Sequence, residues 1–233
     1  MLYEGFEKVN DYTYVALSSK RRHPVIIKTE TRISEPAIWQ KLEDFYFPAM
    51  PLYYGKIKLP DSKLGYCFEY RKGSSIIEFS KGLERKERWQ LISEIVSEYR
   101  TLQHEISERV GRPVVHGDIK PEHIRRADNG QIFFIDWEQA KYCDKQYESL
   151  GVNPFYSAPE VLKGVFDVNS DIYSLAKVAI AILCGESVSS VQHGVQLAFL
   201  EHCTVEELGA LRIALSSDPA QRVGCYELFN KLG

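Results

Sequence analysis

The spacing of apolar residues changes near Arg71, and this change constrains the fold more than any other feature of the sequence. Before it, short runs alternate apolar and polar residues, as in YTYVALSS from Tyr12, which is typical of strands that bury one face. After it, in the pattern of an amphipathic helix, apolar residues recur every three or four positions, at Trp89, Ile92, Val96, Tyr99 and Ile106. The pattern predicts an α+β chain of two lobes: a small antiparallel β-sheet lobe, residues 1–71, and a larger, mainly helical lobe, residues 72–233.

One helix is expected within the small lobe. Ser34 precedes Glu35 and Pro36, and apolar residues follow at Ile38, Trp39 and Leu42. Serine is a favoured helix cap, and proline fits the first helical turn, where its missing N–H is not needed. The sequence therefore predicts a helix that begins after a Ser34 cap.

Length and composition favour a single domain of the cytoplasm. A chain of 233 residues can bury a sizeable core as one unit, residues 1–233. Its 29 basic and 32 acidic residues nearly cancel, so binding to nucleic acid through a global field is not expected. Five scattered cysteines lack disulfide or metal spacing, and the amino terminus MLYEGFEKVN lacks the pattern of a secretory signal. The longest apolar run, LAKVAIAILC, is too short for membrane insertion, and the oligomeric state stays open.

The stretch VVHGDIKPEHIRRADNGQIFFIDWEQA, residues 114–140, gathers ionisable groups around a predicted hairpin. Asn129-Gly130 between apolar runs is a strong hairpin signal, and a hairpin there brings Asp118 near Asp136. One such carboxylate can accept a proton from an attacking hydroxyl, and the other can hold a hard divalent cation. Lys120 can place a positive charge on a phosphoryl group in transfer. The alternative interpretation is a hairpin with solvated charges.

These residues resemble the catalytic motifs of the protein-kinase superfamily, and the resemblance covers nearly the whole chain. HGDIKPEH, residues 116–123, is similar to the HRDxKPxN catalytic loop, and DWE, residues 136–138, stands where the DFG segment would be. The resemblance implies a two-lobed protein-kinase-like fold that transfers the γ-phosphoryl group of ATP to a hydroxyl. It makes Asp118 the catalytic base, with Lys120 beside it, and Asp136 a Mg²⁺ ligand.

Four further positions match residues that steady the catalytic loop of kinases. SAPE ends in Glu160, which is similar to the APE glutamate, and Arg222 matches the arginine that usually pairs with it. Asp171, in SDIYSLA, stands at the position of the buried helix aspartate that supports the loop, and His116 begins the loop itself. The resemblance implies structural support from all four.

The small lobe carries residues that the resemblance assigns to the ATP phosphates. Lys28, at the end of VIIK, is similar to the strand lysine that contacts them. Glu35 matches the helix glutamate that pairs with this lysine, and Glu43 is the competing candidate. Glu35 is preferred because the apolar spacing after it fits the family pattern.

The segment CFEYR, residues 67–71, is similar to the hinge strand that joins the two kinase lobes. Phe68 matches the gatekeeper position beside adenine. The resemblance implies that the backbone from Glu69 to Arg71 takes the edge of the adenine ring.

Four positions depart from the kinase pattern. The hairpin that should be glycine-rich reads EGFEKVNDY, so fewer backbone N–H groups can approach phosphates closely. His123 replaces the asparagine that coordinates a second metal, and since imidazole prefers softer ions, Mn²⁺ is an alternative to Mg²⁺. Glu138 replaces the DFG glycine and is open to two roles, a further metal ligand or a group that repels nucleotide. Gly117 replaces the arginine that commonly receives a phosphorylated activation-loop residue, so that form of control is not expected.

The departures leave three functions open. HGD and IDWE are similar to the aminoglycoside-phosphotransferase and choline-kinase branch, whose members phosphorylate small molecules, and a histidine at position 123 is similar to sugar kinases. Lys120-Pro121 and the Glu160, Asp171 and Arg222 set favour a Ser/Thr protein kinase with a protein substrate. A small-molecule kinase and a catalytically inactive pseudokinase stay as the alternatives.

Overall fold

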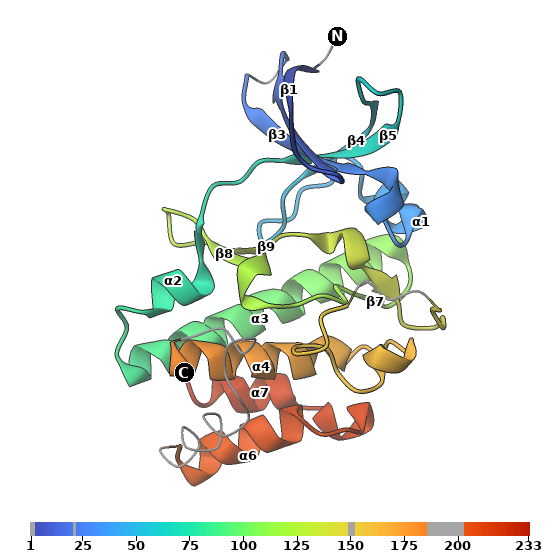
Figure 1. Ribbon diagram of the computed structural model, residues 1–233. Coiled ribbons are helices and arrows are strands. Elements are labelled where there is room, and N and C mark those ends of the chain that lie inside the picture. The colour runs from blue at the N-terminus through green and yellow to red at the C-terminus, as the bar shows by residue number, and fades with distance from the viewer. Residues whose placement is uncertain (1–2, 21, 149–151, 186–202) are drawn as a thin grey trace.

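The computed structural model describes residues 3–20, 22–148, 152–185 and 203–233 (Figure 1). A β-sheet with one short helix, α1 (Pro36–Leu42), lies at one end of the molecule, and the longer helices lie at the other end (Figure 1). An extended connection and a small hairpin lie between them (Figure 1). The chain therefore has the α+β architecture that the apolar spacing predicts.

The small lobe is an antiparallel sheet of five strands. They follow the order β1-β2-β3-β5-β4, so β3 lies at the centre. Buried side chains of three of these strands form a cluster of their own, at Ala16, Val25, Ile27 and Cys67. The strand bounds are β1 Tyr3–Asn10, β2 Thr13–Ser18, β3 Pro24–Thr29, β4 Tyr53–Lys58 and β5 Leu64–Glu69. Lys28 is thus held on a strand that is paired on both sides, opposite Thr13 and Tyr66.

The helix of the small lobe forms where the sequence predicts it, but its start differs. Its N-cap is Glu35, and the Ser34 hydroxyl instead donates to Oε1 of Gln139 at 3.0 Å. The predicted Ser34 cap is therefore wrong, because a residue 105 positions later takes that side chain. Helix α1 buries Ile38, Trp39 and Leu42 against β4 and the long helix of the other lobe.

The large lobe is built around α3 (Arg85–Val110), which crosses the molecule beneath the small lobe (Figure 1). A capping box of Glu84 and Glu87 starts this helix, and Gly111 ends it in the left-handed conformation with φ of 78°. Helices α4 and α7 pack on it, and one apolar core joins both lobes. The other helices are α2 (Ile76–Ser80), α4 (Ser170–Cys184), α6 (Val205–Ala214) and α7 (Cys225–Asn230).

Short strands between the lobes flank the loops that hold Asp118 and Asp136. The predicted hairpin is present: β8 (Ile124–Arg126) pairs antiparallel with β9 (Ile132–Phe134), and Gly130 turns between them with φ of 89°. The remaining short strands are β6 (Ser74–Ser75), which pairs with β8, and β7 (Val114–Val115), which pairs with β10 (Lys141–Tyr142). Both pairings fix the ends of the segments that hold Asp118 and Asp136.

All five cysteines lie in the described part of the chain, and none of them forms a disulfide. Cys67 and Cys225 are buried, and the partial burial of Cys143 raises the pKa of its thiol to about 12. Within the described residues, no helix combines the length and the apolar character needed to cross a bilayer.

Candidate active site

A buried carboxylate fixes the backbone of the loop that holds Asp118. Asp171, on α4, accepts hydrogen bonds from the backbone N–H groups of His116 at 2.7 Å and Gly117 at 3.2 Å, and from the Tyr99 hydroxyl. Burial raises the pKa of Asp171 to about 6, although these hydrogen bonds oppose the rise. The loop therefore rests on α3 and α4 rather than on its own local structure.

His116 links this loop to the segment after β9. Its Nε2 donates to the carbonyl of Ile135 at 2.9 Å, and its Nδ1 accepts from the backbone N–H of Asp118 at 3.3 Å. Burial and the neighbouring His123 lower the pKa of His116 to about 3, so the imidazole is neutral. The centroid of its ring lies 4.6 Å from the ring centroid of Trp137. A neutral histidine thus connects the loop of Asp118 to the segment of Asp136 by two hydrogen bonds.

Only one of the two carboxylate oxygens of Asp118 has a partner among the described residues. Its Oδ2 lies 3.1 Å from Nζ of Lys120, whereas Oδ1 is buried and has no hydrogen-bond partner among the described residues. Asp118 lines a cavity of about 260 Å³, together with Lys120 and His123. Leaving a buried charged acceptor unmatched costs free energy, so the site is set up to receive a donor from outside.

Asp136 sits in a backbone conformation that few residues adopt. Its φ of 62° and ψ of 44° are left-handed, which Asp and Asn tolerate better than most side chains. Its Oδ1 lies 3.1 Å from Nζ of Lys28, and its Oδ2 lies 3.2 Å from Nε2 of His123. Although burial acts to raise it, the pKa of Asp136 is held well below its ordinary value by His123 and Lys28.

The ring of His123 has a fixed orientation. Its Nδ1 lies 2.9 Å from the carbonyl oxygen of Asp118, which can only accept, so Nδ1 carries its proton. Its Nε2 is left facing Asp136, where it forms a hydrogen bond when protonated and offers a lone pair to a cation when it is not.

Asp136 and His123 fit a divalent cation as a pair of protein ligands. Cations that bind nucleotides are commonly held by one or two side chains, with phosphate oxygens and water completing the coordination. No group of three or more His, Cys, Asp or Glu side chains with metal-binding arrangement occurs in the described residues. The two side chains therefore suit a cation that arrives with a phosphate ligand.

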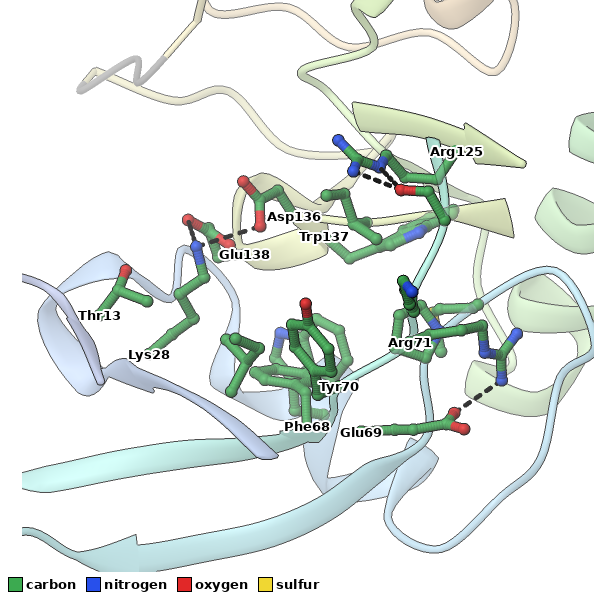
Figure 2. Close-up of a pocket in the computed structure, with 17 residues that line it drawn as sticks. Thr13, Lys28, Phe68, Glu69, Tyr70, Arg71, Arg125, Asp136, Trp137 and Glu138 are labelled. Atoms are coloured by element: carbon green, nitrogen blue, oxygen red, sulfur yellow. Dashed lines mark hydrogen bonds and ion pairs between the residues drawn. The ribbon is translucent and has the colours of Figure 1, made fainter. Parts of the chain in front are cut away.

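The structure corrects the predicted ion pair between Lys28 and Glu35. The partners of Lys28 are Asp136 and Glu138, whose Oε1 is 3.4 Å from Nζ (Figure 2). Burial alone would lower the pKa of Lys28, but the two carboxylates outweigh it and raise the pKa above its ordinary value. Lys28 therefore carries its positive charge inside the cleft.

Glu35 faces a different segment. Its carboxylate accepts from Nζ of Lys145 at 2.9 and 3.2 Å and from the Tyr147 hydroxyl at 2.8 Å. The competing candidate, Glu43, is the C-terminal cap of α1 and lies against Gly55. The predicted pair is wrong because α1 is short and places Glu35 before its first turn, where the segment after β10 takes the carboxylate.

A cavity of about 280 Å³ lies between the lobes beside these charges (Figure 2). The sheet, the connection from Phe68 to Gly73, and the segment from Ile135 to Glu138 line it. It shares Thr13, Lys28, Asp136 and Glu138 with the smaller cavity at Asp118. One continuous cleft thus runs from the connection between the lobes to Asp118.

The predicted hinge residues line this cavity. Phe68 lies edge-on to Trp39, with 4.9 Å between ring centroids. Arg71 donates to Oε2 of Glu69 at 2.7 Å, so these two side chains bind each other (Figure 2). On the opposite wall, Arg125 donates from Nε to the carbonyl of Gly73 at 3.1 Å. The place of Arg125 in the cavity wall could not be predicted, because a basic pair such as Arg125-Arg126 is usually solvated.

Glu160 and Arg222 form a buried bidentate pair. Nη1 of Arg222 lies 2.6 Å from Oε1 of Glu160, and Nη2 lies 2.9 Å from Oε2. Although burial acts to raise it, the pKa of Glu160 is lowered because Arg222 binds the ionised form. The side chain of Arg222 is 0% exposed, so the charges compensate each other away from water.

Gly117 is held where a larger residue would not fit. Its φ is 80°, and a Cβ atom there would lie 2.9 Å from the carbonyl oxygen of Gln139. Lys141 fills the adjoining space with its stem and lies over the rings of Tyr147 and Phe166. Burial lowers the pKa of Lys141 to about 8. The burial of Lys141 could not be predicted, because its position in the sequence does not distinguish it from a lysine on the surface.

The titration of Asp171 gives the first prediction. Since its pKa is about 6 in the folded protein and 3.8 unfolded, the folded state binds more protons between these values, and stability is lost as the pH rises through 6. Asp171→Asn is therefore expected to cost about 1 to 2 kcal/mol more at pH 5 than at pH 7. Urea unfolding at both pH values measures this, with Asp128→Asn at the hairpin turn as the control. A cost that does not change with pH contradicts the shift.

Comparison with known proteins agrees with this arrangement. The sequence profile of the protein kinase domain matches residues 5–230. Calcium-dependent protein kinase 5 of Plasmodium berghei (strain Anka) is 38% identical over 77 residues, which are 31% of this chain and 14% of that protein. Calcium-dependent protein kinase 27 of Arabidopsis thaliana is 28% identical over 123 residues, 51% of this chain and 24% of that protein.

Two more proteins extend the comparison. The probable serine/threonine-protein kinase MARK-C of Dictyostelium discoideum is 29% identical over 130 residues, 50% of this chain and 17% of that protein. All three relatives are thus matched over less than a quarter of their length. The structure of the Cydia pomonella granulovirus kinase PK-1 has the same fold, with a TM-score of 0.70 and 14% identity over 99% of this chain and 93% of that one. Since the kinase profile covers nearly all residues, the chain belongs to the protein kinase family.

Proposed function

We propose that the chain is an ATP-dependent Ser/Thr protein kinase that uses Mg²⁺ or Mn²⁺. The observation that carries the proposal is the carboxylate of Asp118, a residue that lines the same cleft as Lys28 and Asp136 and whose Oδ1 has no hydrogen-bond partner among the described residues. A general base must reach the proton that it takes, and a carboxylate that lines the cleft with one oxygen unmatched is placed to accept a hydrogen bond from an acceptor hydroxyl.

The larger cavity is the proposed site of the nucleotide. Adenine would lie beside Phe68, with its polar edge at the backbone of Glu69 and Arg71, which line the cavity. Lys28 lies further along the cleft and would hold phosphate oxygens by its charge. Asp136 and His123 would hold the cation, which when bound neutralises charge on the phosphates.

The transfer step then uses the residues of the smaller cavity. A serine or threonine hydroxyl would donate its proton to Oδ1 of Asp118 while its oxygen bonds to the γ-phosphorus. The bond from that phosphorus to the bridging oxygen breaks, and ADP leaves with the electron pair. Lys120, 3.1 Å from the other oxygen of Asp118, would balance the charge on the group in transfer.

Three features favour a protein acceptor. Lys120-Pro121 resembles Ser/Thr kinases, Glu160 and Arg222 form the pair typical of protein kinases, and relatives that match part of the chain are named protein kinases. In this proposal residues 1–233 act as one kinase domain, with lobes 1–71 and 72–233. The thiol state of all cysteines favours a reducing compartment such as the cytoplasm.

A ligand and transfer assay tests this proposal. Because a ligand that binds only the folded state stabilises it, ATP with Mg²⁺ or Mn²⁺ at a hundred times its Kd is expected to raise the melting temperature by about 5 to 10 °C. Labelled phosphate from ATP is then expected on serine or threonine of test proteins, and not on aminoglycosides, choline or sugars. No thermal shift at millimolar ATP would support a pseudokinase, and transfer only to small alcohols would support the small-molecule class.

A further inference from the structure

The two carboxylates around Lys28 come from one short segment, but their surroundings differ. Oδ1 of Asp136 lies 3.1 Å and Oε1 of Glu138 lies 3.4 Å from the Lys28 amino group (Figure 2). The side chain of Asp136 is 29% exposed, whereas that of Glu138 is 5% exposed. Asp136 is therefore accessible to a cation, and Glu138 is enclosed with the lysine.

Glu138 is anchored to the residues just before α1. Its carbonyl accepts from the backbone N–H of Ser34 at 2.8 Å, and Nη2 of Arg32 lies 3.5 Å from its Oε1. The next residue, Gln139, accepts from the Ser34 hydroxyl at 3.0 Å and donates to the carbonyl of Arg32 at 3.2 Å. These contacts fix the turn Trp137–Gln139, so the carboxylate of Glu138 is aimed before any ligand binds.

Glu35 is committed to other partners. Its carboxylate accepts three hydrogen bonds from Lys145 and Tyr147, and Glu35 is only 9% exposed. The Tyr147 hydroxyl is itself held by the backbone N–H of Tyr142 at 2.9 Å. Turning Glu35 toward Lys28 would break this set, at a cost for each buried group left unmatched.

We propose that Glu138 is the positioning residue for Lys28, in place of the glutamate of helix α1. The inference rests on the proposed binding of phosphates by Lys28 and adds which residue aims the lysine. A cation competes with Lys28 for Asp136, so Glu138 is the carboxylate that stays with the lysine when nucleotide and metal are bound. Glu138 acts through Lys28 and does not touch the phosphates itself.

The test measures binding of a fluorescent ADP analogue in EDTA, so that no metal contributes. It uses an Asp136→Asn background, because asparagine tolerates the left-handed backbone and removes the competing carboxylate. There, Glu138→Gln is expected to weaken binding about tenfold, since Lys28 loses its charged partner. With Lys28→Met also present, the same change is expected to have no further effect. Glu35→Gln, which removes a charge of the same kind nearby, is the matched control and is expected to leave the affinity within about twofold.

Two results would overturn the assignment. One is a loss of affinity in Glu35→Gln with none in Glu138→Gln. The other is a Glu138→Gln effect that appears only when Mg²⁺ is added, because Glu138 would then be a metal ligand. The test also distinguishes a purely structural role for Glu138. In that case Glu138→Gln would still weaken binding when Lys28→Met is present, and the assignment would be wrong.

Failure of the proposed function gives a different result. A chain that binds no nucleotide in any of these conditions contradicts the kinase proposal. Urea unfolding of Lys28→Met, Glu138→Gln and the double variant then decides the pairing. Coupled effects of the two changes support it, and additive effects overturn it.

Discussion

Asp118→Asn is expected to lower kcat about a thousandfold, because an amide cannot accept the proton of the acceptor hydroxyl. The buried Oδ1 of Asp118 is the atom that would take this proton, and asparagine keeps the size of the side chain. Nucleotide binding depends on the other end of the cleft, so the Kd for ADP is expected to stay within about threefold. Steady-state transfer from labelled ATP measures kcat, and the fluorescent ADP analogue measures Kd.

The control for this variant is Glu122→Gln. Glu122 is an exposed carboxylate in the same loop, four residues after Asp118, and its loss is expected to leave kcat unchanged. An unchanged kcat in Asp118→Asn would remove Asp118 as the base. A loss of ADP binding together with kcat would show instead that the loop had been disturbed.

Arg222→Met is expected to lower the free energy of unfolding by about 3 to 5 kcal/mol, because it leaves the largely buried Glu160 carboxylate with no charged partner and only the Ser170 hydroxyl as a side-chain donor among the described residues. The arginine is fully buried and binds both carboxylate oxygens. It also donates to the backbone carbonyl of Ser216 at 2.8 and 3.0 Å, so one side chain joins three segments. Urea unfolding at pH 7 measures the change.

Two further variants make this result specific. Arg126→Met breaks the more exposed pair with Glu94 and is expected to cost less than about 1 kcal/mol. Adding Glu160→Gln to Arg222→Met is expected to recover part of the lost stability, since the charge left in the interior is then removed. Equal costs for Arg222→Met and Arg126→Met would mean that the buried pair contributes no more than a surface pair.

Much of the fold could be predicted because its patterns are local. The alternation in residues 12–19, the helical spacing from Trp89 and the Asn129-Gly130 turn each depend on near neighbours, and the structure has strands, helix and hairpin there. The Ser34 cap failed for the opposite reason. Its hydroxyl has a partner 105 residues away, which no local pattern contains.

The same distinction explains the candidate site. Asp118 and Lys120 precede the β8–β9 hairpin and Asp136 follows it, so the turn predicts that these residues approach each other, although Asp171 of α4 fixes the backbone of the loop. The partner of Lys28 depends instead on how far α1 extends toward the cleft, which is a property of packing between the lobes. The sequence indicates Glu138 as a departure from the kinase pattern, but it does not predict the contact of Glu138 with Lys28.

The crowded backbone at Gly117 bears on how such a chain can change. An arginine there would need a left-handed backbone, and its Cβ would lie 2.9 Å from the carbonyl oxygen of Gln139. An arginine that could receive a phosphorylated loop residue therefore cannot be added at position 117 without displacing the backbone of Gln139, at the end of the turn that carries Glu138.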